Sequence, residues 1–197
     1  EVTKHLLKNR VLWGIILVKG LRGMSLVALL TVLPLYFAND LNFSPPVRGL
    51  HIGLLIAAGI VAKPLAGLLS DRLGRKQVLV PGLIWSCAAC LMLVVTDQGI
   101  MLTLAIILLG LFLYPDQPII TATILEMVDG NVASTALGLT SSASFLLSSF
   151  SPLVVGALYE LIGIEAALYY VAALFALAAF ILVLIPLASS RTNRDDS

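Results

Sequence analysis

Four polar side chains interrupt stretches of this sequence that are otherwise apolar: Lys19, Arg22, Asp116 and Gln117. Lys19 and Arg22 are spaced i, i+3, so in a helix they share one face and repel each other. A charge costs about 2.5–3.5 kcal/mol at the centre of a membrane helix, and such residues therefore mark functional sites. An acid such as Asp116, an acid elsewhere in the protein, or an anionic ligand would relieve the cations. We predict a small-molecule site at these four residues, with a static ion network between helices as the alternative.

Arg22 has the chemistry to hold an anion in a defined geometry. Counted from Val11 at 1.5 Å per residue, it lies about 17 Å deep, near the middle of a bilayer. Its guanidinium can present two parallel donors to a carboxylate or a phosphate. We expect the stem of Lys63 to carry its amine to the interface. The remaining cations exceed Asp116 by one charge, and the excess is two if Lys63 turns inward instead. This excess favours an anionic or carboxylate-bearing ligand.

Two prolines interrupt the helix that carries the acid. Pro118 lacks an amide hydrogen and crowds the carbonyl of Tyr114, and Pro115 does the same at Leu111. Carbonyls freed at membrane depth must be buried in protein or line a wet cavity. An interrupted helix with polar side chains near the midplane is typical of a transporter binding site, whereas a plain proline kink packed on a neighbour is the structural alternative.

The composition places the chain in a membrane. Its 197 residues are 59% hydrophobic and 12% charged, with a mean hydropathy of +1.04, whereas soluble domains are about one quarter charged. A net charge of +1 gives no support to a nucleic-acid partner. Six apolar runs could each cross a bilayer, which predicts an all-α membrane protein with six transmembrane helices. The expected spans are about 11–38, 49–69, 78–96, 100–125, 132–159 and 166–188, with a lead-in at 1–10 and a mobile tail at 189–197.

The distribution of basic residues predicts the orientation. Six spans put both termini on one side, and the segments on that side carry eight Lys and Arg residues, against Arg48 alone in the opposite loops. Basic loops stay in the cytoplasm. We therefore expect a multi-pass protein of the cell membrane, inner or plasma, with both termini in the cytoplasm.

A dense group of charges lies in the short loop between the second and third spans. It contains Asp71, Arg72, Arg75 and Lys76, with Gly74 where the chain reverses. Because Arg75 and Lys76 begin the third helix, at the end of the helix dipole that disfavours cations, they need a partner, either Asp71 or a lipid phosphate. A basic loop that only fixes the topology is the alternative.

The order of residues in this loop matches a family signature. The pattern G-x-x-S-D-R-x-G-R-K is formed by Gly67, Ser70, Asp71, Arg72, Gly74, Arg75 and Lys76. It resembles the loop signature of the major facilitator superfamily of secondary transporters. The resemblance implies one half of a twelve-helix bundle built from 3+3 inverted repeats. It also implies a gating loop whose charges clasp neighbouring helix ends in one transport state.

The same resemblance implies partners and a mechanism. The chain would be the carboxy-terminal six-helix half and would pair with an amino-terminal half, membrane lipid and a small-molecule substrate, with H⁺ or Na⁺ as candidate coupling ions. Transport would proceed by alternating access around a midplane site. By analogy, the first, second, fourth and fifth spans face the central cavity and the third and sixth face lipid. Because the sequence opens on Glu1 rather than Met, we expect it to be cut from something longer.

Other functions stay open to different degrees. The run Ser151 to Gly156 faintly resembles an antiporter signature of the same superfamily, so a proton-coupled exporter of drugs or metabolites is one alternative. A channel or a non-transporting assembly subunit is another, although no repeated polar rings are evident. An intramembrane protease lacks its parts, since the histidines are His5 and His51 and Asp116 has no partner acid within a span. We predict no enzyme activity, no cofactor and no metal site.

Small residues along the fifth span predict a close-packing surface, because they let helix backbones approach in lipid. They are Gly138, Ser141, Ser142, Ser144, Ser148, Ser149, Ser151 and Gly156.

Overall fold

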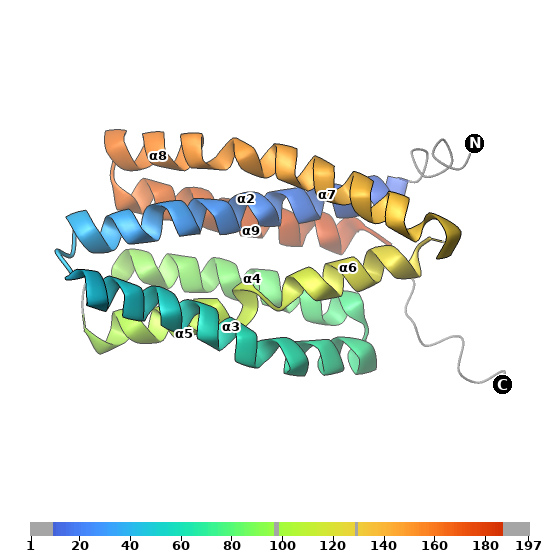
Figure 1. Cartoon of the computed structure of the whole chain (residues 1–197), viewed down its shortest axis with the longest axis horizontal. Coiled ribbons are helices and arrows are strands. Elements are labelled where there is room, and N and C mark those ends of the chain that lie inside the picture. The colour runs from blue at the N-terminus through green and yellow to red at the C-terminus, as the bar shows by residue number, and fades with distance from the viewer. Residues whose placement is uncertain (1–9, 97–98, 129, 187–197) are drawn as a thin grey trace.

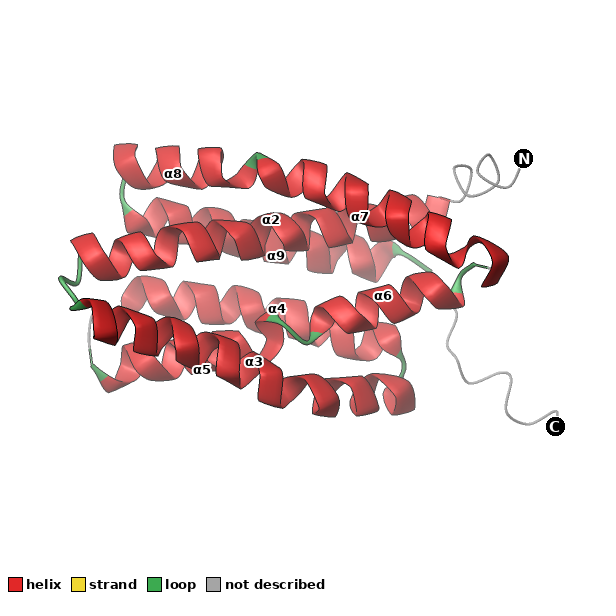
Figure 2. Ribbon diagram, viewed as in Figure 1, coloured by secondary structure: helices red, strands yellow, loops and turns green. Residues whose placement is uncertain are grey.

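The computed structural model describes residues 10–96, 99–128 and 130–186, which form helices joined by short turns (Figure 2). Six helical segments are long and apolar enough to cross a bilayer, so the chain is a multi-pass membrane protein. Residues 1–9 of the predicted lead-in at 1–10, and the whole predicted tail at 189–197, lie outside the described residues. The elements are α2 (Arg10–Asn39), α3 (Pro45–Leu73), α4 (Arg75–Val95), α5 (Ile100–Leu113), α6 (Asp116–Glu126), the 3-10 turn η1 (Gly130–Val132), α7 (Ala133–Ser149), α8 (Ser151–Leu161) and α9 (Ile164–Leu184).

The helices form one bundle of two related three-span units (Figure 1). The first unit contains α2, α3 and α4; the second contains the α5–α6 span, the α7–α8 span and α9. α4 packs on α5 and α9, α2 packs on α7, α8 and α9, and α3 packs on α5. Exchanging the two units maps this set of neighbours onto itself, as 3+3 inverted repeats require. The beginning of α2 and the end of α9 lie at the same end of the bundle.

Burial is uneven around the bundle. α2 and α9 supply many of the buried apolar side chains, such as Leu29, Phe37 and Phe175. α3 and the α7–α8 span are the least buried spans and carry large exposed apolar residues, among them Val61 and Phe145. These outer faces need lipid or another apolar protein surface against them, because exposed apolar area of this extent is not stable in water.

Several element boundaries differ from the expected spans by a few residues, and proline accounts for two of the differences. α3 begins at Pro45, four residues before the expected start of the second span, because proline suits the first turn of a helix, where no amide hydrogen is needed. The fifth span is broken at Phe150 into α7 and α8. Pro152 follows the break and crowds the carbonyl of Ser148 four residues earlier.

Two glycines let α3 and α5 approach closely. A Cβ added to Gly110 would lie 2.3 Å from the carbonyl oxygen of Leu55, and one added to Gly59 would lie 2.6 Å from the Tyr114 ring. Contacts this short leave no room for any side chain. The helix backbones of α3 and α5 are therefore in close contact. This contact holds α5, the first half of the fourth span, against the second span.

Candidate functional site

The centre of the bundle holds a buried ion pair between the first and fourth spans. Arg22 Nε on α2 donates to Asp116 Oδ2 on α6 over 2.5 Å, and the side chains are 1% and 10% exposed. Of the ways in which the two cations could be relieved, the structure has the fixed acid Asp116 on Arg22. The pair ties two spans together across 94 positions of the chain.

The proline break places this acid. α5 ends at Leu113, the turn contains Tyr114 and Pro115, and α6 begins at Asp116, so the predicted interruption of the fourth span is confirmed. Asp116 therefore lies in the first turn of a helix, where the partial positive charge of the backbone favours a carboxylate. The acid is held by a helix start on one side and by Arg22 on the other.

The pair leaves the outer end of the Arg22 guanidinium free. Neither Nη1 nor Nη2 has a hydrogen-bond partner among the described residues, although both atoms are buried. A buried donor without a partner costs about 1–3 kcal/mol, so native proteins rarely leave one unless water or a ligand completes it. Two donors on one planar group are thus available to a bound molecule.

Lys19 is separate from this pair. Its ammonium donates to Ser141 Oγ on α7 over 3.0 Å, and the Ser144 hydroxyl donates to the Lys19 carbonyl oxygen over 3.1 Å. Among the described residues no acid contacts Lys19, so its charge stays uncompensated. The two cations on the shared face of α2 have different roles in the packing, one in an ion pair and one against hydroxyl groups.

A cavity of about 300 Å³ lies between α2, α6 and α7, beside these residues. Three of the four predicted site residues, Lys19, Arg22 and Gln117, line it. Asp116 contacts Arg22 but is not part of the lining. The other lining residues are Gly23, Leu26, Val27, Ile120, Thr121, Ser141, Ser144, Phe145 and Ser148.

Three serines of α7 line the candidate site, although the sequence predicted only a packing role for them. Ser141, Ser144 and Ser148 line the cavity at spacings of three and four, which put them on one helical face. They also pack closely, since a Cβ on Gly23 would lie 2.4 Å from Ser148 Oγ. The sequence did contain an indication of this role, because Ser141 and Ser144 have the same i, i+3 spacing as Lys19 and Arg22.

Lys63 lies away from this cavity. Its amine is 5.8 Å from the centroid of the Tyr114 ring, a cation–π contact with the broken fourth span. The side chain therefore does not reach along the helix to the interface as expected, because an aromatic face within range offers its charge a nearer partner.

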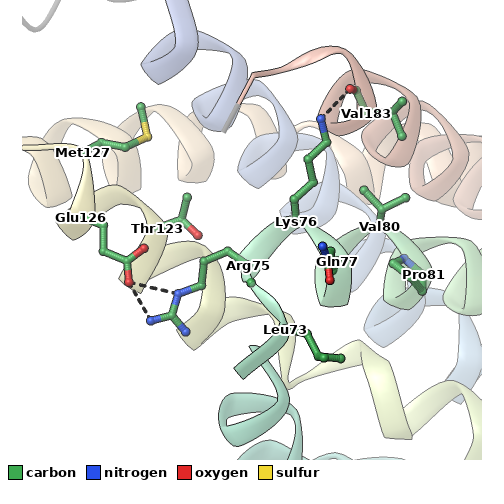
Figure 3. A pocket seen from close by; sticks show the side chains of 11 residues that line it. Leu73, Arg75, Lys76, Gln77, Val80, Pro81, Thr123, Glu126, Met127 and Val183 are labelled. Carbon is green, nitrogen blue, oxygen red and sulfur yellow. Dashed lines mark hydrogen bonds and ion pairs between the residues drawn. The ribbon is translucent and has the colours of Figure 1, made fainter. Parts of the chain in front are cut away.

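The charged loop clasps two helix ends. Arg75 pairs with Asp71 and, from Nη2 to Oε1 over 2.8 Å, with Glu126, the last residue of α6 (Figure 3). Lys76 donates to the carbonyl oxygens of Val183 and Ile185 at the end of α9, over 2.7 and 2.8 Å. Asp71 is the predicted partner of Arg75, whereas Glu126 and the α9 carbonyls were not predicted.

The remaining residues of the signature have simpler surroundings. Gly74 joins α3 to α4 with φ of +107°, a conformation that favours glycine. The Ser70 hydroxyl accepts a hydrogen bond from Arg75 Nη1 over 3.1 Å. Arg72 is exposed, with no hydrogen-bond or ion-pair partner in the described part of the chain, and a Cβ on Gly67 would meet nothing within 4 Å.

Comparison with known proteins decides the family. The sequence model of the Major Facilitator Superfamily matches residues 3–197. The chain belongs to the major facilitator superfamily. The loop signature, the six spans and the inverted repeats are therefore those of a superfamily member.

Several curated superfamily transporters are similar in sequence. The glycine betaine/proline/ectoine/pipecolic acid transporter OusA of Dickeya dadantii is 27% identical over 67% of this chain and 27% of its own length. The probable sulfoacetate transporter SauU of Cupriavidus necator is 29% identical over 78% and 38%. The tetracenomycin C resistance and export protein of Streptomyces glaucescens is 30% identical over 70% and 26%. The chain thus spans roughly a quarter to two fifths of these relatives' lengths.

A solved transporter structure has the same fold. The POT family transporter PepTSo superposes with a TM-score of 0.74 at 16% identity, covering 89% of this chain and 37% of PepTSo. This likeness concerns the fold alone. It confirms the predicted fold class, a six-helix half of a larger bundle.

Proposed function

We propose that this chain is the carboxy-terminal half of a secondary transporter that moves a small carboxylate-bearing solute by alternating access. The solute would bind in the central cavity to Lys19, Arg22 and Gln117, with Asp116 holding Arg22 in place. The observation that carries the proposal is the pair of unpartnered, buried nitrogens at the end of Arg22.

The geometry of the ion pair favours an anion. Asp116 engages Arg22 through Nε, so Nη1 and Nη2 remain as a fork of the kind that binds a carboxylate through two parallel hydrogen bonds. Asp116 neutralises one cation, and Lys19 keeps the cavity positive. In a low-dielectric site this excess charge disfavours a cationic solute.

An amino-terminal six-helix half would complete the site. The least buried spans, α3 and α7–α8, offer apolar faces for it, and Phe145, 77% exposed, lines the central cavity from one of them. The short share of each relative that the chain covers agrees with a missing half. The second half would also supply or share any H⁺ or Na⁺ coupling site.

The names of two relatives support the solute class. Glycine betaine and proline for OusA, and sulfoacetate for SauU, all carry a carboxylate. The export protein of Streptomyces glaucescens favours a second candidate function, efflux of a metabolite or drug. Both candidates use alternating access and differ in the cargo and the direction.

The test uses the full-length protein in proteoliposomes. Saturable uptake with counterflow is expected for a carboxylate from a panel of betaines, amino acids and sulfonates. Arg22→Lys keeps the charge but loses the fork, so solute affinity should fall about ten- to a hundredfold, the value of a charged hydrogen bond. Lys19→Gln should weaken binding less.

Lys63→Gln is the matched control, since it removes a membrane-embedded cation that does not line the cavity. It should leave affinity unchanged. Binding of lipophilic cations that survives Arg22→Ala would contradict the proposal and assign Lys19 and Arg22 to a static ion network.

A further inference from the structure

A second cavity, of about 600 Å³, lies at the end of the bundle where α4 begins (Figure 3). The start of α4, the end of α6 and the end of α9 form it, and we call it the α4–α6–α9 pocket. It shares no lining residue with the central cavity. α6 separates the two, because Gln117 and Thr121 line the central cavity whereas Thr123 and Glu126 line this pocket.

The walls of the pocket are divided into a charged part and an apolar part. Arg75, Lys76 and Gln77 supply the polar side chains from α4. The apolar lining comes from Leu73, Val80, Pro81, Met127 and Val183. A ligand that satisfies both parts has a polar head and an apolar body.

The apolar part continues outward along α4. Pro81 lines the pocket and is exposed, and Trp85, one turn further along the helix, is 40% exposed. Residues four apart lie one above the other on a helix. An apolar path therefore runs from the pocket onto the outer surface of a membrane span, in the direction in which a lipid chain would extend.

Among the described residues that line the pocket, cations outnumber acids. The lining holds two cations, Arg75 and Lys76, and one acid, Glu126, which is already bound to Arg75. Within the described residues Lys76 contacts only carbonyl oxygens, those of Val183 and Ile185, so its full charge remains. Two carbonyl oxygens use two of its three N–H groups. One donor and one positive charge remain for an anion.

We propose that the α4–α6–α9 pocket binds an anionic phospholipid, with the phosphate on Lys76 and Gln77 and an acyl chain along Val80, Pro81 and Trp85. Basic pockets between membrane helices bind anionic headgroups in this way. A soluble anion would leave the apolar wall uncovered, and a neutral lipid would leave the charge of Lys76 unmatched. The basic loop places this end of the bundle at the predicted cytoplasmic interface, where anionic headgroups lie.

The test is native mass spectrometry of the purified full-length protein in detergent, titrated with phosphatidylglycerol or with phosphatidylcholine of the same chains. Phosphatidylglycerol should bind more tightly. Lys76→Gln removes the charge but keeps an N–H donor, and should weaken phosphatidylglycerol binding about fivefold. Arg72→Gln is the matched control, because it removes a charge from the same loop that does not line the pocket; it should change nothing.

Val80→Phe provides an independent measurement that keeps every charge and narrows the apolar wall, so it should also weaken phosphatidylglycerol binding. If Lys76→Gln does not fold, the binding of phosphatidylglycerol to Val80→Phe tests the proposal alone. Equal binding of the two lipids, or equal loss in Lys76→Gln and Arg72→Gln, would overturn the proposal. Full displacement of the lipid by millimolar inorganic phosphate would overturn it too, because it would identify a site for soluble anions.

Discussion

Arg22 is the largest side chain that is fully buried in the described part of the chain, and its surroundings show how a bilayer protein holds a charge. Asp116 pairs with the guanidinium through Nε, and the two buried terminal nitrogens have no partner among the described residues. Arg22 also lines the central cavity. An ion pair that only joined helices would satisfy both partners. The unpartnered atoms of this pair, Arg22 Nη1 and Nη2 and Asp116 Oδ1, support our proposal of a binding site over a static ion network.

The first prediction concerns the cost of separating this pair. Asp116→Asn keeps the shape but leaves the Arg22 charge buried without a counter-ion, so unfolding free energy should fall by about 3–5 kcal/mol. Arg22→Ala should cost a similar amount. The double variant should cost less than the sum, because neither charge is then stranded. Equilibrium unfolding of the detergent-solubilised full-length protein measures all three.

Glu160→Gln is the control for this cycle, since Glu160 is an exposed acid on α8. A surface substitution of this kind changes the free energy of unfolding by no more than about 0.5 kcal/mol. Additive losses in the double variant would show that Arg22 and Asp116 do not stabilise the protein as a pair.

Some residues of the candidate site could be predicted from the sequence, and others could not. Lys19, Arg22 and Asp116 stand out because charges are scarce in apolar spans, so their types alone attract notice. Ser141 and Glu126 are ordinary residues at their own positions. Ser141 contacts Lys19, which lies 122 positions away in the sequence, and Glu126 contacts Arg75, which lies 51 positions away. That pairing depends on tertiary packing, which residue types do not encode locally.

At the scale of elements, two broken spans shape the bundle. The break before α6 was predictable because Pro115 and Pro118 flank polar residues. The break at Phe150 was not, because a single Pro152 in an otherwise helical run is compatible with a kink, a break or a helix start. Small residues predicted close packing of the fifth span but gave no indication of which neighbour it would meet.

The second prediction tests the close approach of α3 and α5. Gly110→Ala places a Cβ 2.3 Å from the backbone oxygen of Leu55, so the helices must separate, at a cost of about 1–3 kcal/mol. Thermal unfolding of the full-length protein measures the loss. Gly53→Ala on α3 is the matched control, because its Cβ would meet nothing within 4 Å. An equal change in both variants would mean that the α3–α5 backbone contact is not a determinant of stability.

The third prediction concerns the clasp formed by Arg75. Asp71→Asn and Glu126→Gln each remove a partly exposed ion pair, worth about 0.5–1 kcal/mol. If the clasp exists in one transport state only, each loss shifts the inward-open to outward-open ratio about two- to fivefold. Arg75→Ala removes both pairs and should shift it further without preventing insertion.

Accessibility labelling of single cysteines from both sides of the membrane reads this shift. Arg72→Gln serves as the control, since Arg72 takes no part in the clasp. Labelling that stays unchanged in all three clasp variants would leave the loop as a topology signal and no gate.

At the scale of the whole molecule, the number of spans was easier to predict than their packing. The six spans and their inverted repeats followed from hydropathy and the loop signature, because bilayer thickness fixes helix length. The pairing of α4 with α9 and the orientation of each span about its own axis did not, because spans that are apolar all round carry little directional information. The half-bundle is therefore well defined by sequence, and its internal packing is not.

The fourth prediction is that residues 1–197 alone do not transport. Residues of α2, α6 and α7 line the central cavity, and in our proposal an opposing half completes it. Purified and reconstituted, this segment should show no saturable uptake, whereas the full-length protein should. Saturable uptake by the monomeric segment would show that six spans suffice.

The 94 positions between Arg22 and Asp116 also determine how long after Arg22 its acid is synthesised. Ribosomes add about 5–20 residues per second, so the first span is made roughly 5–20 s before the acid that neutralises its arginine. During that interval Arg22 has no counter-ion from the fourth span. The first span must wait in a place that tolerates a charge, within the insertion machinery or tilted toward a headgroup. Burial of Arg22 near the middle of the bilayer therefore follows the arrival of the fourth span.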